Sequence, residues 1–256
     1  MEMIFGEQLF IKKSIELKQV IKKFIRFLIL PSIKNIINES YMNELQEIRN
    51  QTVCYSQEGE DLILETFFHG IKNGFYVDIG SYHPKLYSNT YLFYLKGWRG
   101  INIDARPGSK SLFDVARPKD INIETAVGTS TVPLKYFMFD EPGLNGFSED
   151  LSKDREANTN YKIINTIQLS ISSLEKILDV YLPQATSIDF MSIDVEGFDY
   201  DVLQSNNWQK YKPKIILVET SVTDAYDQLN SPISKFLGEM GYSLVAKTYR
   251  TSFYKL

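Results

Sequence analysis

The stretch GFYVDIGSYHP, residues 74–84, decides the interpretation of the fold. Residues 74–78 form a short apolar run that ends on an acid, which is typical of a buried strand in a parallel sheet. Gly80 follows at once, and a glycine there lets a ligand approach the backbone closely. About 25 residues later a second strand pattern, residues 101–104, ends on Asp104. An acid in that position can accept hydrogen bonds from both hydroxyls of a ribose.

The loop after this first strand carries information about the cofactor. A dinucleotide would require a Gly-x-Gly-x-x-Gly turn, in which the pyrophosphate lies on a helix N-terminus. Residues 80–84, GSYHP, supply a single glycine. The missing phosphate cradle argues against a nicotinamide cofactor. It favours S-adenosylmethionine, which contains adenosine but no phosphate.

Strand and helix patterns alternate from this stretch to the end of the chain. We expect strands at residues 74–78, 101–104, 121–124, 188–194, 214–219, 242–247 and 252–256. Helices are expected at residues 88–96, 109–117, 172–181, 200–205 and 231–241. Such alternation predicts a Rossmann-like α/β fold with a seven-stranded, mostly parallel sheet and helices on both faces. The last two strands should form a closing hairpin.

Five of the expected strands end at or near an acid, namely Asp78, Asp104, Glu124, Asp194 and Glu219. A single acid at a strand end is common in turns and helix caps. Five of them along one edge of a parallel sheet predict a shared site for at least three, because ligands bind beyond the carboxyl ends of the strands. Near Asp194 the alternative is that Asp199 caps the next helix and Glu196 is solvated.

Four segments carry a resemblance to a known family: YSQEGED at 55–61, GFYVDIGSYHP at 74–84, GWRGINIDA at 97–105 and SIDVEGFD at 192–199. From about Tyr55 to the end, the chain resembles FkbM-type methyltransferases. These are class I S-adenosylmethionine-dependent enzymes that mostly methylate hydroxyls. The family often has Gly-Ala-Asn-x-Gly after the first strand, whereas this chain has GSYHP at residues 80–84.

The resemblance implies a set of residues around S-adenosylmethionine. Asp104 would hold the ribose, and the turn after Ala126 would border the adenine. The expected cofactor-binding residues are Gln57, Asp78, Gly80, Ser81, Asp104, Ala105, Arg106 and Ala126. For residues 55–61 the alternative is a helix start, with Ser56 as the cap and acids facing the helix dipole.

Two candidates emerge for the chemical step. A sugar hydroxyl is a very weak acid, and a divalent cation that binds it lowers its pKa. Mg²⁺ or Mn²⁺ prefers oxygen ligands, and Asp194 and Glu219 are the candidate metal ligands, with Asp194 also catalytic. Metal-dependent sugar methyltransferases of the macrocin type are similar in placing acids at these two strand ends. The alternative is His83 as a metal-free general base in the first loop.

The expected acceptor is a sugar hydroxyl, on a nucleotide-linked sugar or a capsule- or O-antigen-type surface polysaccharide. A non-sugar small molecule or a lipid is the alternative acceptor, and a non-catalytic scaffold is disfavoured by the acids at Asp104 and Asp194. Net charge is −4, so no basic excess suggests nucleic acid. No apolar run reaches the length of a membrane span, and the expected location is cytoplasmic.

Two segments lie outside these motifs. Residues 1–50 show basic, amphipathic helical spacing, which predicts a helical extension of a catalytic domain at residues 51–256. Such helices can cap the domain, pair in a homodimer or lie on a membrane surface. Residues 140–165 are polar and irregular, and they are predicted to form a long loop that serves as a lid or substrate loop.

Overall fold

The structure is a computed structural model that describes residues 18, 52–220, 222 and 224–256. One compact unit covers Cys54–Leu256 and contains every element discussed below. The predictions for residues 1–50, a helical extension and a homodimer arm, lie outside the described residues. In the described part of the chain, no helix combines the length and the apolar character that crossing a membrane requires.

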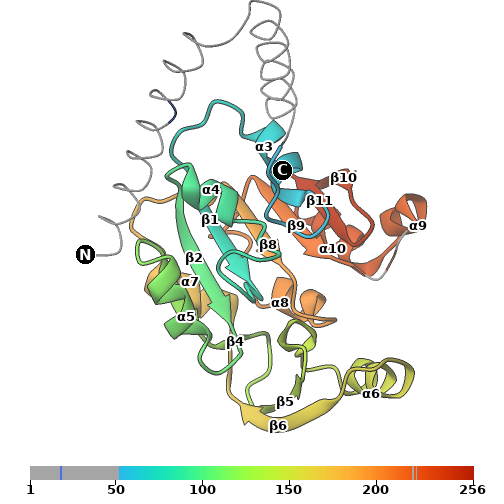
Figure 1. The fold of residues 1–256 in the computed structure, drawn as a ribbon. Coiled ribbons are helices and arrows are strands. Elements are labelled where there is room, and N and C mark those ends of the chain that lie inside the picture. Colours follow the sequence, from blue (N-terminus) through green and yellow to red (C-terminus); the bar gives the residue numbers. More distant parts are fainter. Residues whose placement is uncertain (1–17, 19–51, 221, 223) are drawn as a thin grey trace, which may run out of the picture. The chain divides into compact units, whose positions relative to one another are not determined.

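A seven-stranded sheet forms the centre of the unit, in the order β10-β11-β9-β8-β1-β2-β3 (Figure 1). Neighbouring strands are parallel except where β11 pairs with β9 and β10. The predicted seven-stranded, mostly parallel sheet is therefore confirmed. Its strands are β1 (Phe75–Ile79), β2 (Arg99–Asp104), β3 (Ile121–Glu124), β8 (Phe190–Ile193), β9 (Ile215–Glu219), β10 (Ser243–Lys247) and β11 (Thr251–Lys255).

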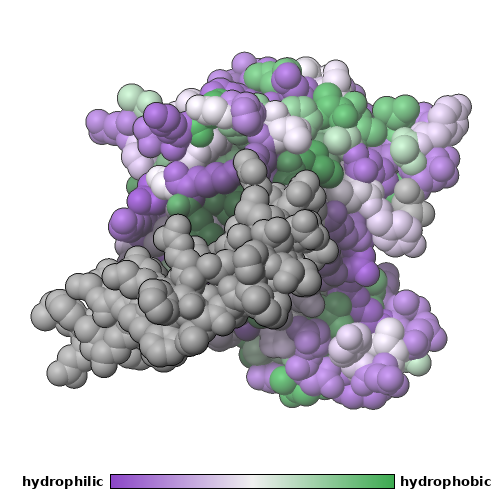
Figure 2. Space-filling model, turned by 45° about the horizontal axis from the view of Figure 1, so that its top comes forward, coloured by the Kyte–Doolittle hydropathy of each residue, from purple (hydrophilic) through white to green (hydrophobic). Residues whose placement is uncertain are grey.

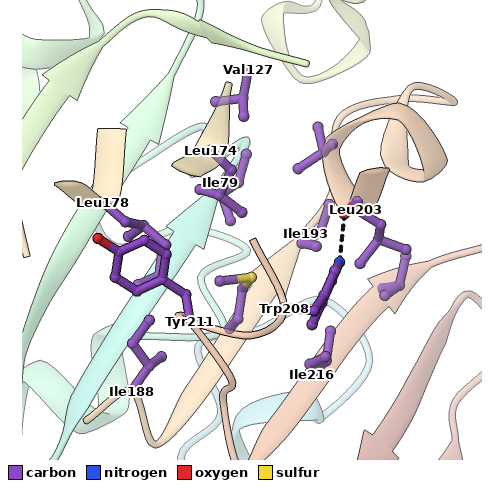
Figure 3. Packing of buried hydrophobic residues seen from close by; sticks show 14 of the residues in the cluster. Ile79, Val127, Leu174, Leu178, Ile188, Ile193, Leu203, Trp208, Tyr211 and Ile216 are labelled. Atoms are coloured by element: carbon purple, nitrogen blue, oxygen red, sulfur yellow. Dashed lines mark hydrogen bonds between the residues drawn. The ribbon is translucent and has the colours of Figure 1, made fainter. Parts of the chain in front are cut away.

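Helices cover both faces of the sheet because alternate strand residues point to opposite sides. One core joins residues such as Ile79, Ile193 and Ile216 to α7 (Leu174–Tyr181), α8 (Asp199–Gln204) and α10 (Pro232–Glu239). Figure 3 shows part of this core, with Leu174 and Leu178 of α7 and Leu203 of α8. The other face packs Tyr76 and Phe190 against α3 (Glu60–Phe67) and α4 (Tyr91–Leu95). The two remaining helices beside this sheet are α5 (Ser109–Ala116) and α9 (Ala225–Leu229). Hydrophilic residues make up most of the visible surface, with smaller hydrophobic groups between them (Figure 2).

An arm between β3 and α7 differs from the prediction. It contains the antiparallel pair β5 (Leu134–Phe139) and β6 (Ile163–Leu169), joined by a short 3-10 helix, η1 (Pro142–Leu144), and by α6 (Glu149–Asn158). Two short strands, β4 (Ala126–Val127) and β7 (Ile171–Ser172), pair at its base. The arm lies beyond the carboxyl ends of the central strands (Figure 1).

The prediction that residues 140–165 form an irregular loop is thus wrong. The α6 helix gives no apolar periodicity because its one buried residue is Ser152. It is instead started by Ser148, whose Oγ accepts a hydrogen bond from the backbone N of Leu151 at 3.3 Å. Serines also cap two other helices: Ser231 caps α10 and Ser173 caps α7.

A buried arginine, Arg117, ties β2 to the loop after β1. Its guanidinium is wholly buried and donates hydrogen bonds to the Pro84 carbonyl at 2.7 Å and the Ser88 hydroxyl at 2.7 Å. It also donates to Thr90 and to Asn102, at 2.8 and 3.1 Å. Thr90 in turn donates to Asp78, 2.7 Å away. Burial raises the pKa of Asp78 to about 6, although Thr90 and Arg117 act against that rise.

This network generates a stability prediction for Arg117→Met. The methionine fills part of the space but removes the cation from a cluster that contains buried Asp78 and Asp120, whose carboxylate lies 3.9 Å from the Arg117 guanidinium. It also removes the guanidinium hydrogen bonds to Pro84, Ser88, Thr90 and Asn102. Losing one partner of a buried charge cluster costs about 3–5 kcal/mol. Urea unfolding should show a loss of that size. Lys110→Met, at an exposed ion pair with Asp114, is the matched control and should change stability by less than about 0.5 kcal/mol. Equal stabilities of the two variants would contradict the structural role of Arg117.

Candidate functional site

The site lies where the order of the strands reverses. β1 has β2 on one side and β8 on the other, both parallel to it. The strands β2 and β3 follow β1 in the sequence and lie on one side of it. The strands β8 and β9 come later in the sequence and lie on its other side. The loops that leave β1 and β8 therefore diverge, and ligands of doubly wound sheets bind in the crevice that this divergence opens.

A pocket occupies this crevice, which is where doubly wound sheets bind small molecules and cofactors. Its floor comes from the strand ends and the turns that follow them: Ile79, Gly80, Tyr82, Ile103, Asp104, Ala105, Asp194, Val195, Glu196 and Phe198. The arm supplies much of the opposite wall: Thr125, Val127, Tyr136, Pro142, Gly143, Asn145, Gly146 and Phe147. From the sequence, residues 140–165 were placed in a lid or substrate loop and the turn after Ala126 beside the adenine, but Thr125, Tyr136 and the folded form of the arm were missed. The Ser148 cap and the Glu149–Lys153 pair at helical spacing were the signals that could have indicated the arm.

Gly80 is required by the closeness of β1 and β8. Its φ is +78°, a region that side chains disfavour. A Cβ built on Gly80 would lie 1.7 Å from the backbone oxygen of Asp194. The backbone N of Gly80 donates to the Ile103 carbonyl at 2.9 Å, so the turn is also fixed to β2. The result is a stretch of bare backbone at the pocket floor.

Asp104 ends β2 with its carboxylate in the pocket wall. Its Oδ2 accepts a hydrogen bond from the backbone N of Tyr82 at 2.7 Å, and its Oδ1 accepts one from the backbone N of Arg106 at 2.8 Å. Burial raises the pKa of Asp104, while these two N–H groups act to lower it. Each carboxylate oxygen has a further lone pair, so Asp104 can also accept hydrogen bonds from a ligand.

Three acids meet on the other side of the floor. In the described residues, Asp194, Glu196 and Glu219 each place an oxygen within 4.8 Å of the others. Burial raises the pKa of Asp194 well above its usual range, and the neighbouring charges of Glu219, Glu196 and Asp199 add to the rise. Such a cluster can hold a proton between its carboxylates or bind a divalent cation.

The turn after β8 is built to present Glu196. Asp199 accepts hydrogen bonds from the backbone N of Val195 at 3.1 Å and of Gly197 at 3.2 Å. Glu196 has a positive φ of +55° and forms an ion pair with Arg155 of α6. The pKa of Asp199 rises to about 7, because the residue is buried and faces Glu219. The alternative in which Glu196 is simply solvated therefore does not match this structure.

The residues expected to bind a cofactor differ in where they lie relative to the pocket. Gly80, Asp104 and Ala105 line the pocket. Ser81 and Ala126 are buried directly beside lining residues, and Arg106 donates from Nη2 to the Tyr82 carbonyl at 2.8 Å. Two others lie elsewhere. Asp78 is buried beneath the floor in the Arg117 network, and the side chain of Gln57 is exposed.

His83 is oriented by the loop that carries it. Its Nδ1 accepts hydrogen bonds from the backbone N of Lys85 at 3.1 Å and of Leu86 at 3.0 Å. A nitrogen that accepts hydrogen bonds carries no proton, so the proton of the neutral ring is on Nε2. Burial lowers the pKa of His83, and Arg106, Lys85 and Arg117 lower it further. The Nε2–H of the ring is therefore the donor that remains for another partner.

The sheet order and the pocket at its reversal define the doubly wound α/β class that binds ligands at the carboxyl edge. Within this class, residues 78–244 match the model of the methyltransferase FkbM domain. The chain belongs to this family and is a methyltransferase. Among the curated proteins, none matches the chain.

The close contact at Gly80 gives a prediction with a matched control. Gly80→Ala and Gly108→Ala both place an alanine at positive φ, but a Cβ at Gly108 meets nothing within 4 Å. We expect Gly108→Ala to cost about 1–2 kcal/mol from backbone strain alone. Gly80→Ala should cost several kcal/mol more, because the Cβ displaces the Asp194 backbone. Thermal unfolding of both variants measures the difference. A difference near zero would mean that β1 and β8 are not this close.

Proposed function

We propose that the chain transfers a methyl group from S-adenosylmethionine to a hydroxyl of a sugar, on a nucleotide-linked sugar or a surface polysaccharide. The observation that carries this proposal is the placement of Asp104 and Gly80 in one pocket, with the acid cluster of Asp194, Glu196 and Glu219 next to them. One side of the pocket suits a ribose, and the other suits an acceptor that must lose a proton.

The residues fit S-adenosylmethionine in three respects. Asp104 has free lone pairs for ribose hydroxyls, and the bare backbone at Gly80 permits a close approach. The loop after β1 contains no glycine after Gly80 before Pro84, so it offers no cradle for a pyrophosphate. The cofactor supplies an activated methyl on a sulfonium. The chain must then hold the acceptor in line and receive its proton.

We assign Asp194 as the group that accepts the proton of the acceptor hydroxyl. It closes β8 at the pocket, and its carboxylate lies within 4.8 Å of those of Glu196 and Glu219. Its raised pKa makes it a better proton acceptor than an ordinary aspartate. Asp194 and Glu219, with Glu196, also provide the oxygen ligands that Mg²⁺ or Mn²⁺ prefers. A bound cation would lower the pKa of the acceptor hydroxyl and also the pKa of the acids that hold it, so proton acceptance and metal binding are alternative roles of the cluster.

The geometry disfavours His83 as the general base. The nitrogen with the free lone pair is Nδ1, and it already accepts two backbone N–H groups. To act as a base, Nδ1 would have to release both of them. The remaining Nε2–H of His83 can donate a hydrogen bond but cannot accept a proton. We therefore assign His83 the role of a hydrogen-bond donor to the acceptor.

The direct test is an acceptor screen. Purified protein with S-adenosylmethionine is incubated with nucleotide sugars and with unrelated hydroxyl compounds, and products are detected by mass. We expect a gain of one methyl group on a nucleotide sugar. Methylation of a lipid or an amine alone would overturn the sugar assignment and leave the methyltransferase intact.

Asp104→Asn should weaken S-adenosylmethionine binding by about 1–3 kcal/mol, because one acceptor for the ribose becomes a donor. Glu124→Gln is the matched control. Glu124 ends the neighbouring strand, is exposed and accepts from the backbone N of Gly108 at 2.8 Å, so its loss should leave binding unchanged. Calorimetry measures both affinities. Unchanged binding by Asp104→Asn would remove the ribose assignment.

Asp194→Asn and Glu219→Gln should each lower the turnover number steeply, by about 100-fold or more, and their combination should cost little extra because the acids act as one unit. If they hold Mg²⁺ or Mn²⁺, a chelator should stop turnover and added metal should restore it. Exposed Glu239→Gln is the control and should leave the rate unchanged. Full activity in excess chelator, lost only in His83→Ala, would replace the acid cluster with a histidine base.

A further inference from the structure

The loop of residues 82–87, between β1 and α4, is held in a costly conformation. Within the described residues, four non-glycine residues have positive φ, and two of them are in this loop: Tyr82 at +49° and Tyr87 at +52°. Each costs on the order of 1 kcal/mol, and such strain persists only where the surroundings impose it. Asp104 holds the N–H of Tyr82, and Arg117 holds the carbonyl of Pro84 from beneath. The loop therefore presents its side chains in a fixed arrangement.

The hydrogen-bonding and charged groups of this loop suit an anion. His83 presents Nε2–H, because its Nδ1 accepts from Lys85 and Leu86. Lys85 is exposed two residues later. Arg106 bonds to the Tyr82 carbonyl, and its buried Nε has no hydrogen-bond partner. The charges that act on His83 are all cationic, from Arg106, Lys85 and Arg117. Two carboxylates adjoin Tyr82 at the start of the loop: Asp104 accepts from its backbone N, and Glu141 accepts from its hydroxyl at 3.1 Å. The cluster of three acids lies around Asp194.

The loop also presents aromatic surface. The rings of Tyr82 and Tyr87 are nearly parallel, with centroids 6.4 Å apart and an interplanar angle of 19°. The guanidinium of Arg106 lies 5.7 Å from the centroid of the Tyr82 ring. Tyr82 therefore has a cation as one neighbour and the Tyr87 ring as another. Tyr87 is 65% exposed and Leu86 is 58% exposed. A large exposed aromatic beside a fixed donor and a lysine is a surface on which a planar base can stack.

We propose that the loop of residues 82–87 binds the nucleoside diphosphate part of the acceptor, with His83 Nε2–H and the Lys85 ammonium on phosphate oxygens and Tyr87 against the base. The inference rests on the proposed function, since it supplies the recognition site for a nucleotide-linked sugar. Tyr82, the first residue of the loop, lines the pocket, so a sugar attached to a phosphate held by the loop can extend toward Asp194. A polysaccharide acceptor without phosphate has no use for these groups.

Calorimetry with two probes tests this site. Uridine diphosphate and inorganic pyrophosphate are titrated into the full chain saturated with S-adenosylhomocysteine, which blocks the cofactor pocket. Because aromatic stacking tolerates any base, one nucleotide suffices. Lys85→Ala should weaken both probes by about tenfold, the scale of one charge-assisted hydrogen bond. Tyr87→Ala should weaken uridine diphosphate by about tenfold and leave pyrophosphate unchanged. The controls Lys110→Ala and Tyr226→Ala, both at exposed residues, should change neither.

Histidine nitrogen resonances give a second readout, since the chain has two histidines. His83 should appear as the Nε2–H form, and its signals should move when pyrophosphate is added. The signals of His69, which is exposed, should not move. A proton on Nδ1 of His83, or no movement, would contradict the donor role.

The outcomes separate this inference from the proposed function. If S-adenosylhomocysteine binds but neither probe does, the phosphate site is wrong and the methyltransferase assignment stands. If Lys85→Ala weakens S-adenosylhomocysteine and not the probes, the anion held by the loop is the cofactor carboxylate, and the inference is overturned. If S-adenosylhomocysteine itself does not bind, the failure lies with the proposed function.

Discussion

The carboxyl ends of β1 and β8 lie so close together that no side chain fits between Gly80 and the backbone of Asp194. This contact fixes the point at which the two halves of the sheet diverge. On one side the chain turns toward Asp104, whose carboxylate fastens the loop after β1. On the other side it turns through Glu196, which Asp199 holds in place. The pocket therefore lies at the carboxyl ends of β1 and β8, with Asp104 from β2 on one side and Glu219 from β9 on the other.

Three parts of the structure surround this site: the loop after β1, the acid cluster and the arm. The buried Arg117 network supports the first loop from beneath, and Lys85 is exposed in that loop. The acid cluster lies on the β8 and β9 side, where a proton or a divalent cation can be held. The arm with β5, β6 and α6 closes the pocket from beyond the sheet and reaches the cluster through the Arg155–Glu196 ion pair.

The sheet could be predicted because its strands are apolar runs that end in acids, and Asp104, Asp194 and Glu219 were found in this way. Asp78 has the same sequence signature, but its side chain points beneath the floor to Thr90. The face of the sheet to which this side chain points depends on how the strand is oriented. The arm was missed because α6 buries only Ser152 and leaves no apolar period to detect. The donor role of His83 depends on two backbone N–H groups of its own loop, and no residue pattern indicates that geometry.

The central claim is that a nucleoside cofactor lies between Gly80 and Asp104 with its reactive end toward Asp194. A crystal structure with S-adenosylhomocysteine tests it most directly. The account predicts ribose hydroxyls within hydrogen-bond distance of the Asp104 carboxylate, adenine near Ala105 and Val127, and the sulfur facing the side of the pocket formed by Asp194 and Glu196. A ligand that binds elsewhere, or one whose ribose does not contact Asp104, would contradict it.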